Sequence, residues 1–220
     1  MNSINQILQG DCVEVLKSLP DNFVDLAVTD PPYLVNYRDR SGRTIENDSG
    51  SPEFLGAFSD LYRVLKQDSF CVCFYGWSRV DEFFGAWRQA GFRPVGHIVW
   101  QKDYSSRSAF LQYRHEKAYL LVKGNPRRPA KPLADVQPRE YSGNRAHPTE
   151  KAVGILTPVI QAFSKPGAIV LDPFSGSGST AVAAALSGRR YIGIELEERY
   201  CRHARTRLAG AARYAARKAA

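Results

Sequence analysis

Two short motifs carry the side chains with the clearest potential for chemistry. Asp30-Pro31-Pro32-Tyr33 follows the apolar run Val24–Thr29, and residues 172–180 (Asp-Pro-Phe-Ser-Gly-Ser-Gly-Ser-Thr) follow Ala168–Leu171. In an open α/β sheet, ligands bind beyond the carboxyl ends of the strands, which is where both motifs fall. There the carboxylate of Asp30 and the carbonyl of Pro31 could accept the N–H hydrogens of an amine. The first motif therefore indicates amine chemistry, and the second indicates a separate binding turn.

The second motif favours a nucleoside cofactor. Gly176 and Gly178 permit close approach of a ligand to the backbone, and the helix that follows offers unpaired N–H groups. The turn is not a Walker loop, because no lysine precedes Ser179. Glu195 ends the next predicted strand, just under twenty residues after the turn, where dinucleotide folds place an acceptor for ribose hydroxyls. This spacing does not distinguish NAD from S-adenosylmethionine.

The elements that must position these motifs form an alternation of short apolar runs and helical patterns, which predicts an α/β sheet. The expected strands are Gln6–Gln9, Val24–Thr29, Ser69–Phe74, Gly96–Trp100, Ala118–Val122, Ala168–Leu171 and Tyr191–Ile194. The expected helices are one with an apolar face from Phe54 to Leu65, Arg79–Gln89 capped by Ser78, one from Thr149 to about Phe163, and Ala181–Leu186. Residues 34–50 and 124–148 are expected to be functional loops.

Composition sets the broad class. A chain of 220 residues with 44% hydrophobic and 24% charged residues is typical of one soluble globular domain. No apolar stretch approaches the length of a membrane span, and the N-terminus lacks a signal sequence, so a cytoplasmic location is expected. The four cysteines show neither metal-ligand nor disulfide spacing, and Cys71 and Cys73 are expected in a buried strand. No metal site is predicted.

The net charge of +8 suits a polyanionic partner. The C-terminal residues 199–220 hold seven basic residues and no acid, which indicates either a contact with such a partner or a solvated helix face.

Together the motifs resemble those of the β-type amino-methylating DNA methyltransferases, the N6-adenine/N4-cytosine family. The matching segments are Gly10-Asp11-Cys12, Asp30–Tyr33, residues 146–151 (Ala-His-Pro-Thr-Glu-Lys) and residues 172–180. The similarity extends from about Gly10 to Arg207, and Ala152 stands where the family usually has proline. The resemblance implies a Rossmann-like S-adenosylmethionine-dependent methyltransferase fold, with a seven-stranded mostly parallel sheet flanked by helices. It also implies one domain, 1–220, with a catalytic half (about 10–123), a basic loop for target recognition (about 101–146) and a cofactor half (about 147–207).

The resemblance also assigns roles to individual residues. S-adenosylmethionine is the implied cofactor, with Asp11 at its adenine, Glu195 at its ribose, and Lys151 at its carboxylate end. The full set of implied cofactor-binding residues is Asp11, Cys12, Asp30, His147, Thr149, Lys151, Asp172, Phe174, Ser175, Gly176, Ser177, Gly178, Thr180 and Glu195.

The implied reaction is direct transfer of a methyl group to the N6 amine of adenine in double-stranded DNA, with Asp30, Pro31, Pro32 and Tyr33 as catalytic residues. The lone pair of an exocyclic amine is delocalised into the ring, so acceptors for its hydrogens favour the pyramidal nitrogen that attacks and stabilise its developing charge. Tyr33 is expected to stack on the extruded base, a contact worth about 1–3 kcal/mol. No covalent intermediate, and so no nucleophilic cysteine, is required.

Double-stranded DNA is the expected partner, and extrusion of a base costs a few kcal/mol that protein contacts must offset. Contacts with phosphate beside the extruded nucleotide are expected from Arg38, Arg40 and Arg43. The resemblance implies a second group of DNA-binding residues in the stretch where this family usually carries target recognition: Lys102, Arg107, Arg127, Arg128 and Lys131. The resemblance adds a homodimer and a cognate restriction endonuclease, as in restriction-modification systems, to the expected partners.

Two alternatives stay open. Aspartate before the two prolines favours adenine, since cytosine-N4 members of the family more often carry serine there, so cytosine-N4 methylation is the first alternative. The second is a catalytically inactive nucleic-acid-binding module of the same fold. Retention of Asp30, Tyr33, both glycines and Glu195 argues against it. An RNA or protein acceptor is less favoured, because protein-amide enzymes of this type usually carry asparagine in place of Asp30.

Overall fold

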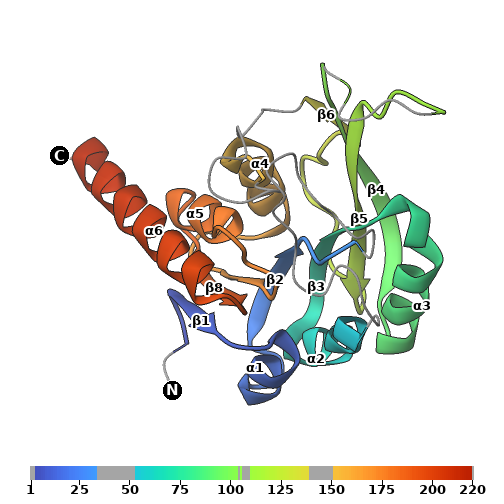
Figure 1. Ribbon diagram of the computed structural model, residues 1–220, viewed down its shortest axis with the longest axis horizontal. Helices are drawn as coiled ribbons and strands as arrows, with labels where there is room; N and C mark the ends of the chain where they lie inside the picture. Colours follow the sequence, from blue (N-terminus) through green and yellow to red (C-terminus); the bar gives the residue numbers. More distant parts are fainter. Residues whose placement is uncertain (1–2, 34–52, 104, 106–109, 139–150, 220) are drawn as a thin grey trace.

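The computed structural model describes residues 3–33, 53–103, 105, 110–138 and 151–219, with side chains up to residue 217. A single eight-stranded sheet runs through these segments in the order β1-β8-β7-β2-β3-β5-β4-β6 (Figure 1). The strands are β1 (Gln6–Gln9), β2 (Val24–Thr29), β3 (Leu65–Phe74), β4 (Arg93–Gln101), β5 (His115–Lys123), β6 (Val136–Pro138), β7 (Ile169–Asp172) and β8 (Arg190–Glu195). Only β5 runs antiparallel to its neighbours, β3 and β4.

The prediction of an α/β fold with a mostly parallel sheet is confirmed, but the number of strands was wrong. The eighth strand is β6, which pairs parallel with β4 through Val99 and Val136. It lies within the segment 124–148, predicted as a loop. Three residues ending in proline give no alternating pattern, so the pairing depends on the neighbouring strand rather than on local sequence.

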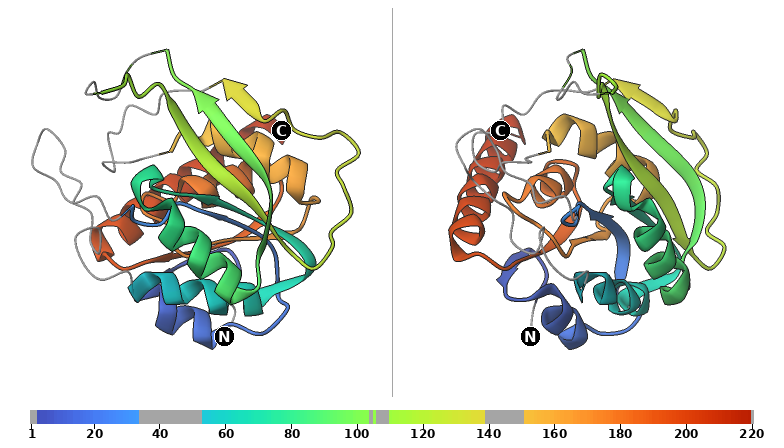
Figure 2. Two further views of the ribbon diagram at one scale, coloured as in Figure 1. Left: turned by 90° about the vertical axis from the view of Figure 1, so that its right-hand side faces the viewer. Right: turned by 45° about the vertical axis from the view of Figure 1, so that its right-hand side comes forward.

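Helices cover both faces of the sheet (Figure 2). They are α1 (Cys12–Ser18), α2 (Ala57–Val64), α3 (Val80–Ala90), α4 (Val153–Phe163), α5 (Ser179–Leu186) and α6 (Glu198–Ala219), with short 3-10 turns η1 (Glu53–Gly56) and η2 (Trp77–Arg79). Successive residues of a strand point to opposite faces. Ala27 and Cys71 accordingly pack with α1, α2 and α3, whereas Val28 and Val72 pack with α4 and α5.

Most helix ends follow from local signals. The Asp11 carboxylate caps α1 by accepting hydrogen bonds from the N–H groups of Val13 and Glu14. Gly91 ends α3 with a left-handed φ of 101°. Two predicted boundaries were wrong: Leu65 begins β3 rather than ending the helix face, and Ser78 lies inside η2 and does not cap α3.

The remaining helix predictions were close to the structure. α4 begins at Val153, and the predicted cap Thr149 lies outside the described residues. α5 begins at Ser179. All four cysteines are free and buried, and Cys71 and Cys73 lie in β3 as predicted. None of the helices in the described part of the chain has both the length and the apolar character needed to cross a membrane.

Candidate functional site

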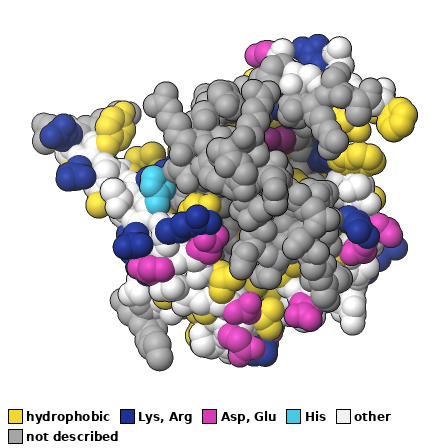
Figure 3. Space-filling view, in the orientation of Figure 1, with side chains coloured by type: hydrophobic (Ala, Val, Ile, Leu, Met, Phe, Trp, Pro, Cys, Tyr) yellow, Lys and Arg dark blue, Asp and Glu magenta, His cyan; other side chains and the backbone are white. Residues whose placement is uncertain are grey.

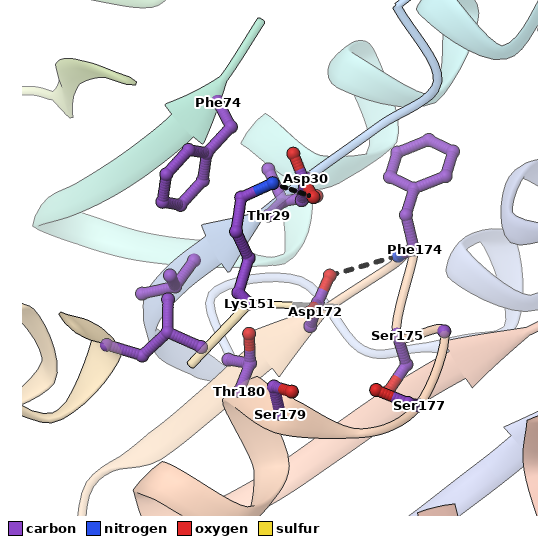
Figure 4. Close-up of a pocket in the computed structure, with 13 residues that line it drawn as sticks. Thr29, Asp30, Phe74, Lys151, Asp172, Phe174, Ser175, Ser177, Ser179 and Thr180 are labelled. Carbon is purple, nitrogen blue, oxygen red and sulfur yellow. Dashed lines mark hydrogen bonds and ion pairs between the residues drawn. The ribbon is translucent and has the colours of Figure 1, made fainter. Parts of the chain in front are cut away.

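The two motifs meet in one pocket because their strands are neighbours. β2 pairs in parallel with β7, with Ala27 opposite Leu171, so both strands end at the same edge of the sheet. The pocket at this edge is lined by residues of both motifs and by Lys151 (Figure 4). Its lining is Val28, Thr29, Asp30, Phe74, Lys151, Leu156, Asp172, Phe174, Ser175, Gly176, Ser177, Ser179 and Thr180. The predicted meeting of the two motifs is thus present.

The carboxylate of Asp30 is held by two donors. One oxygen accepts a hydrogen bond from the Tyr33 hydroxyl at 2.6 Å, and the other pairs with Nζ of Lys151 at 2.5 Å. Burial, with the nearby charge of Asp30, raises the pKa of Tyr33 well above its ordinary value, so the hydroxyl stays protonated and donates. Tyr33 therefore orients Asp30 in this structure, in addition to any stacking role.

Lys151 is a buried cation with a specific set of partners. Its side chain is only 8% exposed, and Nζ lies 2.5 Å from Asp30 and 3.8 Å from Oε2 of Glu116. The ammonium also lies over the ring of Phe74, 4.9 Å from the centroid, and 5.7 Å from that of Tyr33. The sequence placed Lys151 at the carboxylate end of a cofactor. The structure joins it to Asp30, and Glu116 is a neighbour that sequence reasoning missed.

The glycine-rich turn, defined here as residues 174–179, is fixed by Glu195. One carboxylate oxygen of Glu195 accepts from the N–H of Gly176 at 2.8 Å, and the other accepts from the N–H of Glu197 at 2.8 Å. Gly176 and Gly178 have φ values of 49° and 80°, in the left-handed region that favours glycine. Burial raises the pKa of Glu195. The Glu195 carboxylate thus connects β8 to the glycine-rich turn, next to the predicted position of the cofactor's ribose hydroxyls.

Asp172 lies at the base of the pocket and is almost fully buried. Its Oδ1 accepts a hydrogen bond from the N–H of Phe174 at 3.1 Å. Burial raises the pKa of Asp172 to about 7, because the charged form loses solvation. A cationic ligand in the pocket would favour the ionised carboxylate, which makes Asp172 a natural partner for positive charge.

A further support of the glycine-rich turn comes from α6, and no sequence pattern predicted it. Nη1 of Arg207 donates to the carbonyl oxygen and Oγ of Ser177, both at 2.8 Å, and to Oγ of Ser179 at 3.1 Å. Arg207 was grouped with the C-terminal basic run, but the structure directs it inward. The spacing of the buried residues Cys201, Ala204 and Leu208 marks the same inner face of the helix.

The rest of the basic run divides between structural contacts and the surface. Arg205 donates to the carbonyl of Ile7 at 2.8 Å, and Arg199 pairs with Glu197 at 2.6 Å. Figure 3 shows several Lys and Arg side chains along α6, at the left of the view. Arg213 and Arg217 are exposed toward its C-terminal end. A solvated helix face accounts for this outer part of α6.

Replacement of Gly178 by alanine is expected to destabilise the turn. A Cβ there would lie 2.7 Å from Cβ of Ala204, so the side chain would collide with α6 in addition to straining the backbone. We expect a loss of about 1–2 kcal/mol from the left-handed backbone and about 1–3 kcal/mol more from overpacking. Gly188→Ala is the matched control, because its φ is +73° and nothing lies within 4 Å of its added Cβ. Urea unfolding of both variants measures the difference, and equal losses would contradict a close contact with α6.

Other predicted site residues border the pocket without lining it. Asp11 caps α1, and the hydrogen bond from the N–H of Gly10 to the carbonyl of Glu195 keeps it beside the end of β8. Burial raises the pKa of Cys12 to about 12, so its thiol stays protonated. Five other predicted site residues in the described part of the chain also lie outside the lining of the pocket: Pro31, Pro32, Tyr33, Gly178 and Glu195. His147 and Thr149 fall outside the described residues.

The predicted DNA contacts agree less well with the structure. Arg38, Arg40, Arg43 and Arg107 lie outside the described residues. Lys102 is buried, so its ammonium is not on the surface as a phosphate contact requires.

Three of the basic residues are exposed: Arg127, Arg128 and Lys131. The connection that contains them starts at the edge of the sheet opposite Asp30. β5 is antiparallel to β3 and ends at Lys123 opposite Ser69, so residue 124 leaves from the edge opposite Asp30. The antiparallel direction of β5 could not be read from its composition. The part of Arg127, Arg128 and Lys131 in target recognition stays a prediction.

Comparisons with known proteins identify the class. Solved structures of methyltransferases share the fold: M1.HpyAVI in complex with SAM has a TM-score of 0.73 and 25% identity, covering 92% of this chain and 98% of that one. The cytosine-N4-specific PvuII DNA methyltransferase has the same TM-score at 18% identity, covering 90% and 84%, and shows the fold alone.

The sequence comparisons give the family. A protein of Escherichia coli (strain K12) named as a methylase, YubD, is 56% identical over 210 residues, 96% of this chain and 92% of that protein. The type II methyltransferase M.HinfI of Haemophilus influenzae is 28% identical over 247 residues, 93% of this chain and 68% of that protein. Residues 24–206 match the model of the N6/N4 DNA methylase family, and the chain belongs to this family.

Proposed function

We propose that this protein transfers the methyl group of S-adenosylmethionine to the N6 amine of adenine in double-stranded DNA. The single observation that carries the proposal is the shared pocket, in which Asp30 faces the glycine-rich turn. The family supplies the class of reaction. Asp30 before the two prolines supports adenine over cytosine.

The residues of the pocket fit S-adenosylmethionine. Asp30 and Asp172 provide negative charge for a ligand that carries a sulfonium and an ammonium group. Thr29 is a pocket-lining residue whose Oγ1 is buried without a hydrogen-bond partner among the described residues, and a polar ligand would satisfy such a group. The backbone N–H groups at the start of α5 add donors for a carboxylate. When bound, S-adenosylmethionine supplies an electrophilic methyl group.

Asp30 acts on the target amine in two ways, as a hydrogen-bond acceptor and as a negative charge. Its carboxylate accepts one N–H hydrogen, and the Pro31 carbonyl accepts the other, which keeps the nitrogen lone pair directed toward the methyl carbon. As the amine accepted a methyl group, positive charge would develop on its nitrogen, and the nearby carboxylate would stabilise it. The nitrogen would then give one proton to the Asp30 carboxylate or to water. Tyr33, donating to Asp30 at 2.6 Å, fixes the orientation of that carboxylate.

Mass analysis of nucleosides tests the proposal. Unmodified duplex DNA is incubated with the protein and methyl-labelled S-adenosylmethionine, digested, and separated, with Asp30→Ala as the inactive control. Labelled N6-methyladenine is expected. Labelled N4-methylcytosine alone would replace adenine by cytosine as the acceptor, and the absence of any labelled nucleoside would favour the inactive binding module. A homodimer, a companion restriction endonuclease and a cytoplasmic location stay predictions.

A further inference from the structure

A stacked aromatic pair, with Trp77 exposed and Tyr113 half-buried, lies near the proposed catalytic motif and does not line the pocket. The rings of Trp77 and Tyr113 are stacked, with centroids 6.0 Å apart and planes inclined by 22°. Trp77 is 58% exposed, although tryptophan is usually well buried. Phe110 and Leu111, shortly before Tyr113 in the chain, are also exposed. Large apolar side chains gathered at one place on a surface commonly mark a binding site.

The topology places this pair at the same edge of the sheet as Asp30. Trp77 follows β3, which is parallel to β2, so both strands end at one edge. Gly76 packs directly on Tyr33: a Cβ at Gly76 would lie 2.7 Å from the carbonyl oxygen of Tyr33. Tyr113 lies in the connection from β4 to β5. Because β4 is antiparallel to β5 and β5 is antiparallel to β3, this connection also crosses the Asp30 edge.

Two arginines lie close to the pair in the chain. Arg79 is in the same short turn as Trp77, and Arg114 follows Tyr113 and is exposed. The pKa of the neighbouring His115 is lowered, first by burial and then by the charges of Lys117 and Lys102. Arg79 pairs with Glu82, and the Arg114 guanidinium donates to the carbonyl of Asp103 at 3.4 Å. An aromatic face bordered by cations is the combination that binds single-stranded nucleic acid.

We propose that Trp77 and Tyr113 form a stacking platform for a nucleobase of the DNA substrate that has left the base stack next to the catalytic site. The inference rests on the proposed function and deepens it by naming residues outside the pocket that hold the DNA. Stacking on an aromatic ring is independent of base identity, because every base has a π face. The platform would help to offset the cost of extruding the target base.

The chain offers a direct optical test. It contains three tryptophans, and Trp87 and Trp100 are 0% and 1% exposed, so the emission that iodide can reach is that of Trp77. The probe is a mixed-sequence single-stranded oligonucleotide of about 16 nucleotides. The control probe is an abasic chain of equal length, which has the same phosphates but no bases. We expect the first probe to quench Trp77 and protect it from iodide, and the second to do neither.

Variants separate stacking from folding. Trp77→Ala is expected to weaken binding of the base-bearing oligonucleotide roughly tenfold, the loss of one base–aromatic stack, with unchanged thermal unfolding. Trp77→Phe keeps a ring and is expected to bind within about threefold of wild type but without the optical signal. Tyr214→Ala removes another exposed aromatic, 63% exposed on α6, and should change nothing.

Equal quenching by both probes, or unchanged affinity of Trp77→Ala, would overturn the platform. If the wild type methylated duplex DNA in spite of such a result, the proposed function would stand and only the stacking platform would be excluded. A wild-type protein that neither methylates DNA nor binds the oligonucleotide would overturn both.

Discussion

Asp30→Ala is expected to reduce kcat by about 10²–10³-fold while the affinity for S-adenosylmethionine changes little. The carboxylate acts mainly as the amine nitrogen becomes positive, so its removal affects the transition state more than binding of the cofactor. Single-turnover methylation and calorimetric titration with the cofactor measure the two quantities. A variant that kept more than about a tenth of the wild-type rate would have lost less than about 1.4 kcal/mol and would exclude amine activation by Asp30.

The same strand supplies a control for this variant. Asp25 pairs with Lys66 at 2.6 Å, much as Asp30 pairs with Lys151, but Asp25 is not among the pocket-lining residues. The Asp25 carboxylate also accepts a hydrogen bond from the N–H of Ile169 at 2.8 Å. Asp25→Asn weakens this hydrogen bond, so some stability is expected to be lost. Its rate per folded molecule should remain that of the wild type. Equal losses of rate in both variants would point to a general effect of disturbing β2.

Lys151→Met is expected to be the most destabilising change in the pocket. It removes a cation that is 8% exposed and leaves Asp30 and Glu116, with side chains 19% and 23% exposed, without their shared partner. Breaking a buried pair costs about 3–5 kcal/mol, and we expect the lower part of this range because both carboxylates retain some solvent. Methylation should fall at least as far as in Asp30→Ala. Chemical denaturation at neutral pH measures the loss of stability.

Two further variants make this prediction specific. Lys66→Met breaks the corresponding pair of Asp25, but Lys66 is 44% exposed, so the expected cost is only about 0–1 kcal/mol. The double variant Asp30→Asn with Lys151→Met removes both charges of the Asp30–Lys151 ion pair and should recover part of the lost stability while remaining inactive. A double variant no more stable than Lys151→Met alone would show that Lys151 contributes through packing rather than through its charge.

The sequence predicted the features that depend on local patterns. β1 and β2 have the predicted bounds, and the other predicted strands differ at their ends, because runs of apolar residues bounded by polar turns mark strands well. The meeting of Asp30 with the glycine-rich turn also followed, since both motifs end parallel strands. The position of β6 was not predicted, because its pairing with β4 is a tertiary contact.

Contacts between individual side chains far apart in the chain could not be predicted from the sequence. Lys151 is 121 residues from Asp30, and Arg207 is 30 residues from Ser177, so no spacing rule connects either pair. Arg207 looked like part of a surface charge run because composition does not show which face of a helix is buried. The edge of the sheet from which the segment of Arg127 and Arg128 starts was equally unpredictable, because it depends on the direction of β5, which only the assembled sheet fixes.

The structure of the protein with S-adenosylmethionine bound would decide whether the two motifs form one methyl-transfer site. We expect the cofactor in the pocket between Asp30 and the glycine-rich turn, with Asp172 near its positive groups and its methyl group directed toward the Asp30 carboxylate and the Pro31 carbonyl. A cofactor bound elsewhere, or bound here with its methyl group directed away from Asp30, would contradict this expectation.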